Sequence, residues 1–445
     1  MAQGRTLCLT RPILVQSSAL TVVLGVIGYR ILMDFGYRAL VAESFDYQGF
    51  RSESTPQAAL VSWLFLLSLV PLLLRVIRTE TLSGQVTTLL AMTSLVPTTT
   101  LIAHDLRYTG WYLLLLYVYW LVFLVACVIV PAIRPFHRLF HRSFRSEIPH
   151  VLVFVVSAST ILYLSWQHTG FRLHFGLFDV YELRAEAREY QVATIIGYVA
   201  TISDNVLPVL LAFYLRRQWL VLSAMVMVVI LFNFGISATK QVMFLLMFAL
   251  ASVAVRERTR LGQKVLPVLA SFIMIGILER LLFDTNVVGG LLMHRVLFLP
   301  AYLHGIYYEF FQANDLLYLT QSALRFFFES SYRENVQFLL GEYFIDDFTA
   351  RANNGLFSDG YMNFGAASVL FYPVLCVAVL KLLEGAASGL SKSVQFVVIL
   401  VAAFVIQGVP LPTAMLNSGL GFLIILLPTL PRPGNGAAPA APVPA

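Results

Sequence analysis

The sequence predicts an all-α fold, a polytopic helical integral membrane protein with about twelve transmembrane helices. Its mean hydropathy is +0.78, and 58% of its residues are hydrophobic whereas only 12% are charged. These values lie far outside the range of soluble proteins. Most residues fall in apolar segments close to the ~20 residues that a ~30 Å hydrocarbon core requires. We therefore expect one transmembrane domain over residues 1–430.

The expected spans follow one another along the whole chain, and each is a largely apolar segment without a run of charges. In chain order they are residues 13–33, 58–77, 82–103, 111–131, 149–167, 193–215, 218–236, 239–256, 265–283, 362–382, 394–409 and 414–430. The longest gap falls between the ninth and tenth spans. The Pro/Ala-rich tail 431–445 has no large apolar side chains and is expected to be disordered.

Charge asymmetry predicts the orientation of these spans. Three basic segments alternate so that they share one side, namely 134–145, 216–217 and 256–264. The positive-inside rule makes that side cytoplasmic and places both termini there. Most of the 24 acidic residues then fall outside, chiefly in the loops 34–57, 168–192 and 284–361. We expect the chemistry on the external side.

Several function classes are excluded at this stage. The net charge of +6 comes from residues dispersed through short loops beside spans, as orientation requires, so we expect no nucleic acid partner. Cys8, Cys127 and Cys376 are too far apart and too apolar in context for a disulfide framework or zinc site. There is no P-loop, metal-ligand cluster or Gly-x-Ser-x-Gly elbow, which favours chemistry without a metal or cofactor.

The two long external loops are the expected functional segments, because long ordered loops usually carry function. The loop 284–361 contains two aromatic stretches, 302–311 and 326–332, mixed with single charges. Such stretches are typical of short helices lying in the membrane interface. That geometry would flank a cavity reached from the lipid.

The best anion site in the sequence lies in loop 168–192. Arg184 and Arg188 are four residues apart, so a helix would project both from one face at a spacing that clamps a diphosphate. Glu182, Glu186 and Glu189 surround them, and a solvated face with salt bridges is the alternative interpretation.

Further cations stand near predicted span ends. Lys240 follows a turn in which Gly235 permits the bend, and an anion at the next helix N-terminus would explain it; a lysine that snorkels to the interface is the alternative. His294 and Arg295 add charge at the membrane surface. Arg325, Glu329 and Arg333 have a spacing that predicts a ladder of opposite charges on a helix, for which a structural role is favoured.

The segment 353–365 enters the tenth span with Asn, Asp and Gly in turn-forming positions. It is expected to cap that helix and to offer amides to a sugar.

The order of these features resembles the bacterial O-antigen and oligosaccharide repeat-unit polymerases. The resemblance rests on Tyr181-Glu-Leu-Arg184, on the turn Gly235 to Lys240, on a long late external loop and on the segment Asn354 to Gly365. It covers roughly residues 150–385, and the first four spans match only in being hydrophobic. An Arg-Gly spacing described for some members has no counterpart in this chain.

The resemblance implies a metal-independent glycosyltransferase, with a GT-C-like architecture as one option, on the periplasmic face of the bacterial inner membrane. It would transfer a glycan from one undecaprenyl-diphosphate carrier to the non-reducing end of the repeat unit on another. A chain-length regulator and a flippase would be its protein partners, and the lipid bilayer its surroundings.

Site roles carried over in this way remain hypotheses. The residues expected to hold the diphosphate are Arg184, Arg188, Lys240, Arg295, Arg325 and Arg333. The candidates for the base that takes the acceptor proton in an inverting-type displacement are His294, Glu182 and Asp359. The candidates for sugar binding are Asn353, Asn354, Asn363 and Tyr181.

Two other functions share much of this physics. A flippase or transporter of lipid-linked or anionic solutes fits the number of spans, whereas the lack of evident internal symmetry counts against it. A ligase or other glycosyltransferase with a polyprenyl donor fits as well, although Asp34, Glu43 and Asp46 do not form the acidic pair common in such enzymes.

Overall fold

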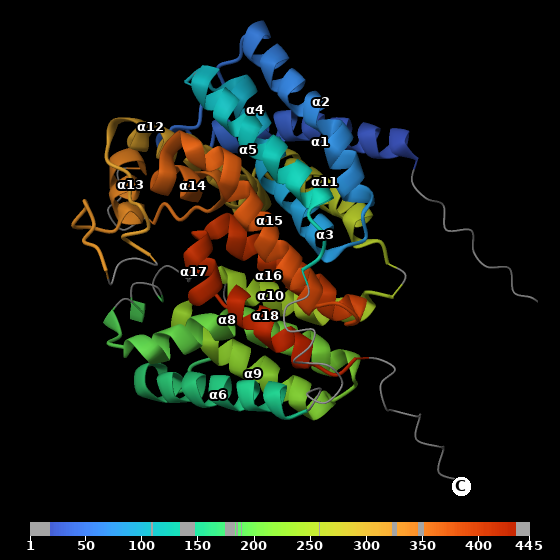
Figure 1. The fold of residues 1–445 in the computed structure, drawn as a ribbon, viewed down its shortest axis with the longest axis vertical. Helices are drawn as coiled ribbons and strands as arrows, with labels where there is room; N and C mark the ends of the chain where they lie inside the picture. The colour runs from blue at the N-terminus through green and yellow to red at the C-terminus, as the bar shows by residue number, and fades with distance from the viewer. Residues whose placement is uncertain are drawn as a thin grey trace, which may run out of the picture.

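A computed structural model describes most of the chain, and every regular element in the described part is helical (Figure 1). The described residues are 18–107, 110–133, 147–173, 183, 186–187, 189–257, 259–322, 327–345 and 351–432.

The helices follow one another along the chain, and the described connections include a long segment around residues 284–355. Their bounds are α1 Ala19–Gly36, α2 Pro56–Arg78, α3 Leu82–Leu90, α4 Val96–His104, α5 Gly110–Ile129, α6 Ile148–Leu164, α8 Thr194–Arg216, α9 Leu220–Ser237, α10 Lys240–Ala251, α11 Leu261–Phe283, α12 Leu299–Ala313, α13 Val336–Ile345, α14 Leu356–Phe364, α15 Ser368–Ala386, α16 Lys392–Gly408, α17 Leu411–Leu416 and α18 Leu420–Leu426. Shorter π and 3-10 segments join them, namely η1 Tyr37–Ala42, η2 Asp46–Gln48, η3 Ala91–Leu95, η4 Ser165–Thr169, η5 Ser252–Ala254, η6 Gly289–Phe298, η7 Gly365–Ala367 and η8 Leu427–Thr429.

Ten helices in the described residues are long and apolar enough to cross a membrane, which makes this a multi-pass membrane protein. They are Ala19–Ala42, Pro56–Arg78, Leu82–His104, Gly110–Ile129, Ile148–Thr169, Thr194–Arg216, Leu220–Ser237, Leu261–Phe283, Leu356–Ala386 and Leu411–Thr429. The shorter apolar helices Lys240–Ala254 and Lys392–Gly408 fall on the two remaining predicted spans. That these two also cross stays a prediction.

Local chemistry explains where several spans begin. The hydroxyl of Ser18 accepts a hydrogen bond from the backbone N–H of Thr21 at 3.1 Å, ahead of α1. Thr55 caps α2 in the same way, with Pro56 in the first turn, where its missing N–H costs nothing. Thr81 caps α3. Ser/Thr caps directly before apolar segments therefore define these helix starts.

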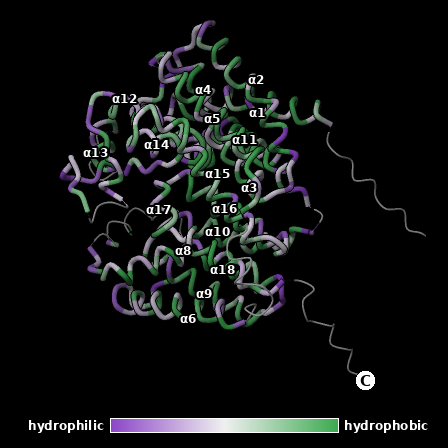
Figure 2. Tube along the Cα trace, in the orientation of Figure 1, coloured by the Kyte–Doolittle hydropathy of each residue, from purple (hydrophilic) through white to green (hydrophobic). Residues whose placement is uncertain are grey.

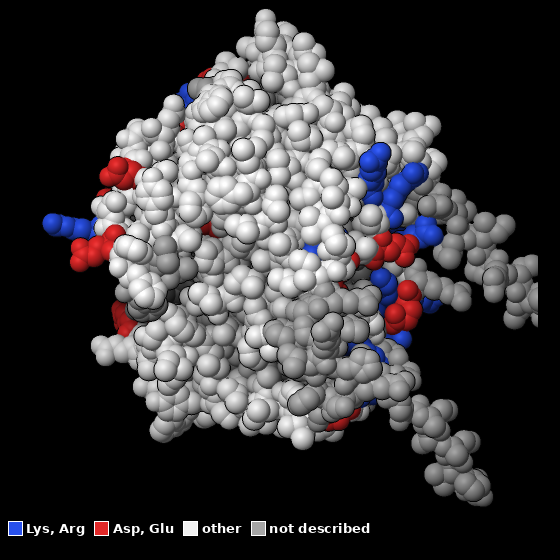
Figure 3. Space-filling view, in the orientation of Figure 1, with Lys and Arg blue, Asp and Glu red and all other residues white. Residues whose placement is uncertain are grey.

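Two of the three predicted basic segments, 216–217 and 256–264, meet at one end of the molecule, and the third, 134–145, lies outside the described residues. Three ion pairs lie at that end: Glu147–Arg217 at 3.0 Å, Glu257–Arg216 at 3.3 Å and Glu80–Arg260 at 3.0 Å. Figure 3 shows most of the visible Lys and Arg along one edge, interleaved with Asp and Glu, a second group of charges that is mainly Asp and Glu along the opposite edge, and a broad uncharged band between them. We call the first edge the basic end and the opposite one the α12 end.

The spans lie in two groups (Figure 1). Helix α15 packs against α5, and α2 packs against α4, in the group that also holds α1 and α11. Helices α6, α8, α9 and α10 pack against one another in the second group, and α16 joins the groups by packing against both α3 and α8. Figure 2 shows hydrophobic residues along the spans and hydrophilic ones mainly at the two ends.

The segment after α11 differs from the expected interfacial loop, because η6 and α12 insert into the bundle. The side-chain amide of Gln407 donates to the carbonyl of Val296 at 3.0 Å and to that of Thr93 at 3.3 Å, and Thr93 lies midway along the Leu82–His104 span. The aromatic residues of 302–311 are buried inside the protein rather than set in the interface. Phe327 and Phe328 are exposed, at 77% and 60%.

Two local predictions were wrong. The turn before α10 bends at Ala238, whose φ is +48°, whereas Gly235 lies within α9. Gly235 is instead needed for close packing, since a Cβ there would lie 2.5 Å from the carbonyl oxygen of Arg172. Residues 327–335 form turns rather than a helix, so Glu329 and Arg333 are not on a common helical face.

Candidate functional site

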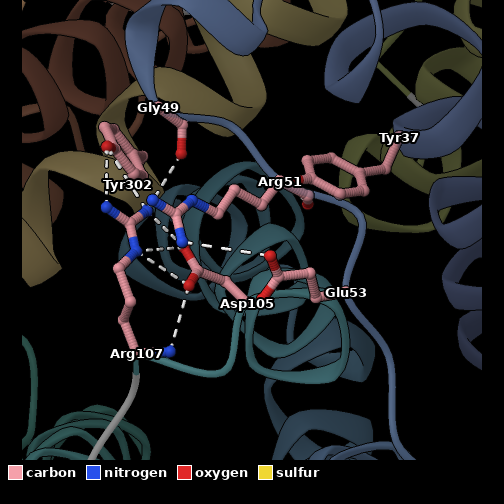
Figure 4. Close-up of polar contacts among 7 residues, drawn as sticks. All are labelled: Tyr37, Gly49, Arg51, Glu53, Asp105, Arg107 and Tyr302. Carbon is pink, nitrogen blue, oxygen red and sulfur yellow. Dashed lines mark hydrogen bonds and ion pairs between the residues drawn. The ribbon is translucent and has the colours of Figure 1, made fainter.

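Three segments meet at the α12 end and form a polar cluster, which we call the Arg107 cluster (Figure 4). The loop between η1 and α2 supplies part of it, the residues after α4 supply another part, and α12 supplies the third. Its members are Gly49, Arg51, Glu53, Asp105, Arg107, Tyr302 and Glu309.

The ion pair of Asp105 and Arg107 forms the centre of the cluster. The Nε of Arg107 donates to the two carboxylate oxygens of Asp105 at 2.9 and 3.1 Å, and one terminal nitrogen donates to the same carboxylate. Asp105 is 2% exposed and Arg107 is 33% exposed. Hydrogen bonding to Asp105 raises the pKa of Arg107 above its ordinary value, so the guanidinium stays charged.

Arg107 also fixes its neighbours. The Arg107 guanidinium donates to the carbonyl of Gly49 at 3.0 Å and to the hydroxyl of Tyr302 at 3.3 Å. Its central carbon also lies over the Tyr302 ring, 5.3 Å from the ring centre. Only glycine fits at position 49, because its φ is +89° and a Cβ would lie 2.4 Å from the Tyr302 hydroxyl. The loop is therefore held close to α12.

Arg51 places a second guanidinium at the edge of the cluster, and the dashed line from this guanidinium in Figure 4 runs to Glu53. Its side chain is 54% exposed and lies 3.9 Å from Glu53. The hydroxyl of Tyr37 donates to the Arg51 carbonyl at 2.5 Å, and the N–H of Glu53 donates to the carbonyl of His104 at 2.9 Å. These bonds fix the backbone that carries Arg51.

A small cavity of about 10 Å³ lies between the centre of the cluster and α12, enough for about one water molecule. Its lining residues are Asp105, Arg107, Tyr302, Gly305, Ile306 and Glu309. Glu309 is exposed, whereas every other residue of 301–311 is buried. Partial burial raises the pKa of Glu309, with Arg107 opposing and Asp105 adding to the shift.

A second ionic group lies inside the membrane spans beneath this cluster. Arg30 is fully buried, pairs with Asp34 and donates to the Thr99 hydroxyl at 3.0 Å and the Ser62 hydroxyl at 3.1 Å. His104, 3% exposed, has its Nε2 3.7 Å from Asp34. Buried ionisable groups in spans are either structural pairs or functional sites.

The structure places the predicted cations in different surroundings. Lys240 is half-buried at the start of α10, which packs against α8, α9 and α16. Arg295 is exposed on η6, which packs against η1, α11 and α12, and Arg333 is exposed in the turns before α13. Five predicted site residues lie outside the described residues: Tyr181, Glu182, Arg184, Arg188 and Arg325.

His294 is 1% exposed, and its ring stacks on Phe45 at 3.8 Å. Its Nε2 lies 2.7 Å from the side-chain oxygen of Gln48, so Nε2 carries the proton, and the buried Nδ1 has no hydrogen-bond partner. Burial, with a smaller contribution from Arg295, lowers the pKa of His294 to about 3. A base of that pKa would be weak at neutral pH.

Two of the three asparagines proposed for sugar binding are buried and engaged within the protein. Asn354 donates to the carbonyl of Pro300 at 3.1 Å and to the Ser358 hydroxyl at 2.7 Å, beside His304. Asn363 donates to Asp359 and accepts from the N–H of Leu319. Asn353 is exposed.

Asp359 is fully buried and accepts hydrogen bonds from Tyr372, from Asn363 and from the N–H of Leu411 at 2.5 Å. These three partners join α14, α15 and α17 around one carboxylate, an arrangement that stabilises the packing of the helices. Helix α14 begins after Gly355 without the side-chain cap that the sequence suggested.

Sequence reasoning missed Arg51, Asp105, Arg107, Tyr302 and Glu309. One available signal was the Asp-x-Arg pattern of residues 105–107 directly after a predicted span. Another was Glu309, the one carboxylate within the aromatic stretch 302–311. Among the described residues, no group of three or more His, Cys, Asp and Glu side chains is placed to hold a metal ion.

Comparison with known proteins found no matching family model, no matching curated protein and no matching solved structure.

Proposed function

We propose that this protein is a glycosyltransferase that polymerises undecaprenyl-diphosphate-linked oligosaccharide repeat units on the periplasmic face of a bacterial inner membrane. The observation that carries the proposal is the position of Glu309, a carboxylate with a raised pKa beside Arg107, on a helix that inserts into a multi-pass membrane bundle. A lipid-linked substrate keeps its reactive diphosphate at the membrane surface, where this cluster lies.

The proposed reaction is a displacement at the anomeric carbon. Glu309 takes the proton of the acceptor hydroxyl while that oxygen bonds to the anomeric carbon of the donor glycan. The bond from that carbon to the diphosphate oxygen breaks, and undecaprenyl diphosphate leaves with the electron pair. Neither an oxidant nor a nucleotide is required.

Guanidinium groups would stabilise the charge that develops on the leaving diphosphate. Arg51 and the exposed part of Arg107 lie in the cluster, and Arg295 is exposed on the segment that precedes α12. Arg184 and Arg188 remain predicted contributors from loop 168–192, with Lys240, Arg325 and Arg333 as further candidates. Both termini are proposed to be cytoplasmic, opposite the reaction.

One observation favours transport as the second candidate function. The buried Arg30, Asp34 and His104 group lies in the spans, and ionisable groups at that depth often line ion or substrate pathways. A transporter would move the lipid-linked glycan across the bilayer without changing its covalent structure.

The test is incubation of the purified protein in liposomes with a lipid-diphosphate-linked repeat unit, in EDTA and without nucleotide. We expect a ladder of polymers on a gel, lost in Glu309→Gln and reduced in Arg184→Ala and Arg295→Ala. Intact substrate that only crosses the bilayer would establish transport instead, and transfer of a single glycan to a foreign acceptor would establish a ligase.

A matched control keeps the variant comparison clear. Glu334→Gln removes an exposed carboxylate from the same long external segment but outside the Arg107 cluster. We expect it to form ladders like those of the unchanged protein. Equal loss of activity in both variants would contradict a specific role for Glu309.

A further inference from the structure

The loop of residues 43–53, which we call the strap, is fixed on its inner side and exposed on its outer side. Phe50 is buried, and the side chain of Asn286 donates to the carbonyl of Leu40 at 2.8 Å and to the hydroxyl of Ser44 at 3.0 Å. With the bonds that Tyr37 and Arg107 make to strap carbonyls, these contacts attach the inner side of the strap to the rest of the protein.

Tyr47 on the outer side of the strap is 71% exposed, yet its hydroxyl is held in place. The buried Nε2–H of His294 donates to the Gln48 side-chain oxygen at 2.7 Å, and the Gln48 side-chain N–H donates to the Tyr47 hydroxyl oxygen at 3.1 Å. Burial lowers the pKa of His294 to about 3, so the ring is neutral. A tyrosine that only anchors the protein in lipid needs no such chain.

Because its oxygen accepts from Gln48, the Tyr47 hydroxyl keeps its proton free to donate outward. The aromatic ring of Tyr47 offers a flat apolar face, and the centre of the Phe45 ring lies 6.2 Å from the centre of the Tyr47 ring. Asp46 is exposed on the same strap; its Oδ1 accepts from the backbone N–H of Tyr47 at 2.7 Å, and the carboxylate can also accept from a sugar hydroxyl. The strap also packs against α13 through η2, and α13 carries the exposed Glu342 and Tyr343.

We propose that the strap is a preformed carbohydrate-binding surface, on which a sugar ring stacks against Tyr47 and donates to or accepts from Tyr47 and Asp46. The ligand is the glycan of the lipid-linked substrate, recognised apart from its diphosphate. This inference rests on the proposed function for the identity of the glycan. His294 and Gln48 are positioning residues that act through Tyr47.

The test uses full-length protein in nanodiscs and the soluble repeat-unit oligosaccharide released by mild acid from lipid-linked intermediates of the producing cells. Saturation-transfer NMR titrations give its dissociation constant without any lipid or diphosphate contribution. We expect about fivefold weaker binding for Tyr47→Phe, which loses one hydrogen bond, and at least about tenfold weaker binding for Tyr47→Ala. Trp166→Ala, which removes an aromatic side chain of similar exposure from η4, should leave the dissociation constant unchanged.

The positioning role has its own readout. Gln48→Leu should weaken binding about as much as Tyr47→Phe, and the double variant should be no weaker than either single one, because all three lack the same hydrogen-bond chain. Additive losses of affinity in the double variant would contradict the hydrogen-bond chain from Gln48 to Tyr47. Unchanged affinity in Tyr47→Ala would overturn the surface itself.

The two proposals fail separately. Binding that depends on Tyr47 in a protein that forms no polymer would retain the carbohydrate surface and reject the polymerase. Polymer formation together with glycan binding that does not depend on Tyr47 would retain the polymerase and reject the carbohydrate surface.

Discussion

Glu309 combines three properties that a general base at a membrane surface needs. It is exposed, it lies beside Arg107, and partial burial raises its pKa above the ordinary 4.5. A base must be ionised to accept a proton, so the rate should fall as the pH drops through this raised pKa. Polymer formation measured against pH should therefore lose its acidic limb in Glu309→Gln, together with most of its rate. An unchanged profile would contradict the assignment.

The Asp105 and Arg107 pair should contribute to stability in a way that depends on both partners. Arg107→Ala leaves a carboxylate that is 2% exposed without its partner. We expect a loss of about 2–3 kcal/mol in the free energy of unfolding, below the ~3–5 typical of a fully buried pair because Arg107 is partly exposed.

Thermal unfolding in detergent tests this, with two comparisons. Asp105→Asn combined with Arg107→Ala should recover much of the lost stability, because the unpaired charge is gone. Glu53→Ala breaks the exposed pair with Arg51 and should change stability by no more than about 0.5 kcal/mol. Equal losses of stability in Arg107→Ala and Glu53→Ala would contradict the larger loss expected from breaking the buried pair.

Residue-level prediction from sequence had a clear physical limit here. Arg107 contacts Tyr302 across 195 positions of sequence, and no periodicity or local motif reports such a contact. Asn354 and Asn363 look like free amides in sequence, but both make hydrogen bonds within the protein. The Arg184 and Arg188 pair lies outside the described residues, so its role remains a prediction.

At the scale of elements, apolar length located the spans well because it measures the requirement that a bilayer imposes. The insertion of η6 and α12 escaped prediction because an aromatic stretch with single charges suits either an interfacial helix or one buried within the protein. The hydrogen bonds from the Gln407 side-chain amide to the carbonyls of Val296 and Thr93 decide between these two possibilities.

The close approach of α9 to the end of the α6 segment gives an element-scale prediction. Gly235→Ala would place a Cβ 2.5 Å from the Arg172 carbonyl oxygen, forcing the backbone to move. We expect a loss of about 1–3 kcal/mol, as for overpacked sites. Gly28→Ala in α1 is the matched control, since nothing lies within 4 Å of its Cβ. It should be neutral or stabilising by up to about 1 kcal/mol. Similar melting temperatures in the two variants would count against the contact.

For the whole molecule, charge distribution predicted which loops share an end, and the ion pair of Arg216 with Glu257 confirms this for segments 216–217 and 256–264. The assignment of the basic end to the cytoplasm stays a prediction from the positive-inside rule. The charge of a loop predicts at which end of the molecule the loop lies, but it carries no information on how the two groups of spans pack.

Orientation can be measured with single cysteines in a chain whose Cys8 is replaced; Cys127 and Cys376 are buried. Arg256→Cys lies at the basic end, and Gln312→Cys lies at the α12 end. A membrane-impermeant maleimide added to intact spheroplasts should label position 312 at once and position 256 only after permeabilisation. The opposite pattern would place the Arg107 cluster in the cytoplasm.

The most direct test of the central claim is polymer formation by the purified protein from a lipid-diphosphate-linked repeat unit in EDTA. The account predicts a ladder with the unchanged protein, release of free undecaprenyl diphosphate in proportion, and neither product with Glu309→Gln. A folded, lipid-embedded protein that leaves the substrate covalently intact would contradict it.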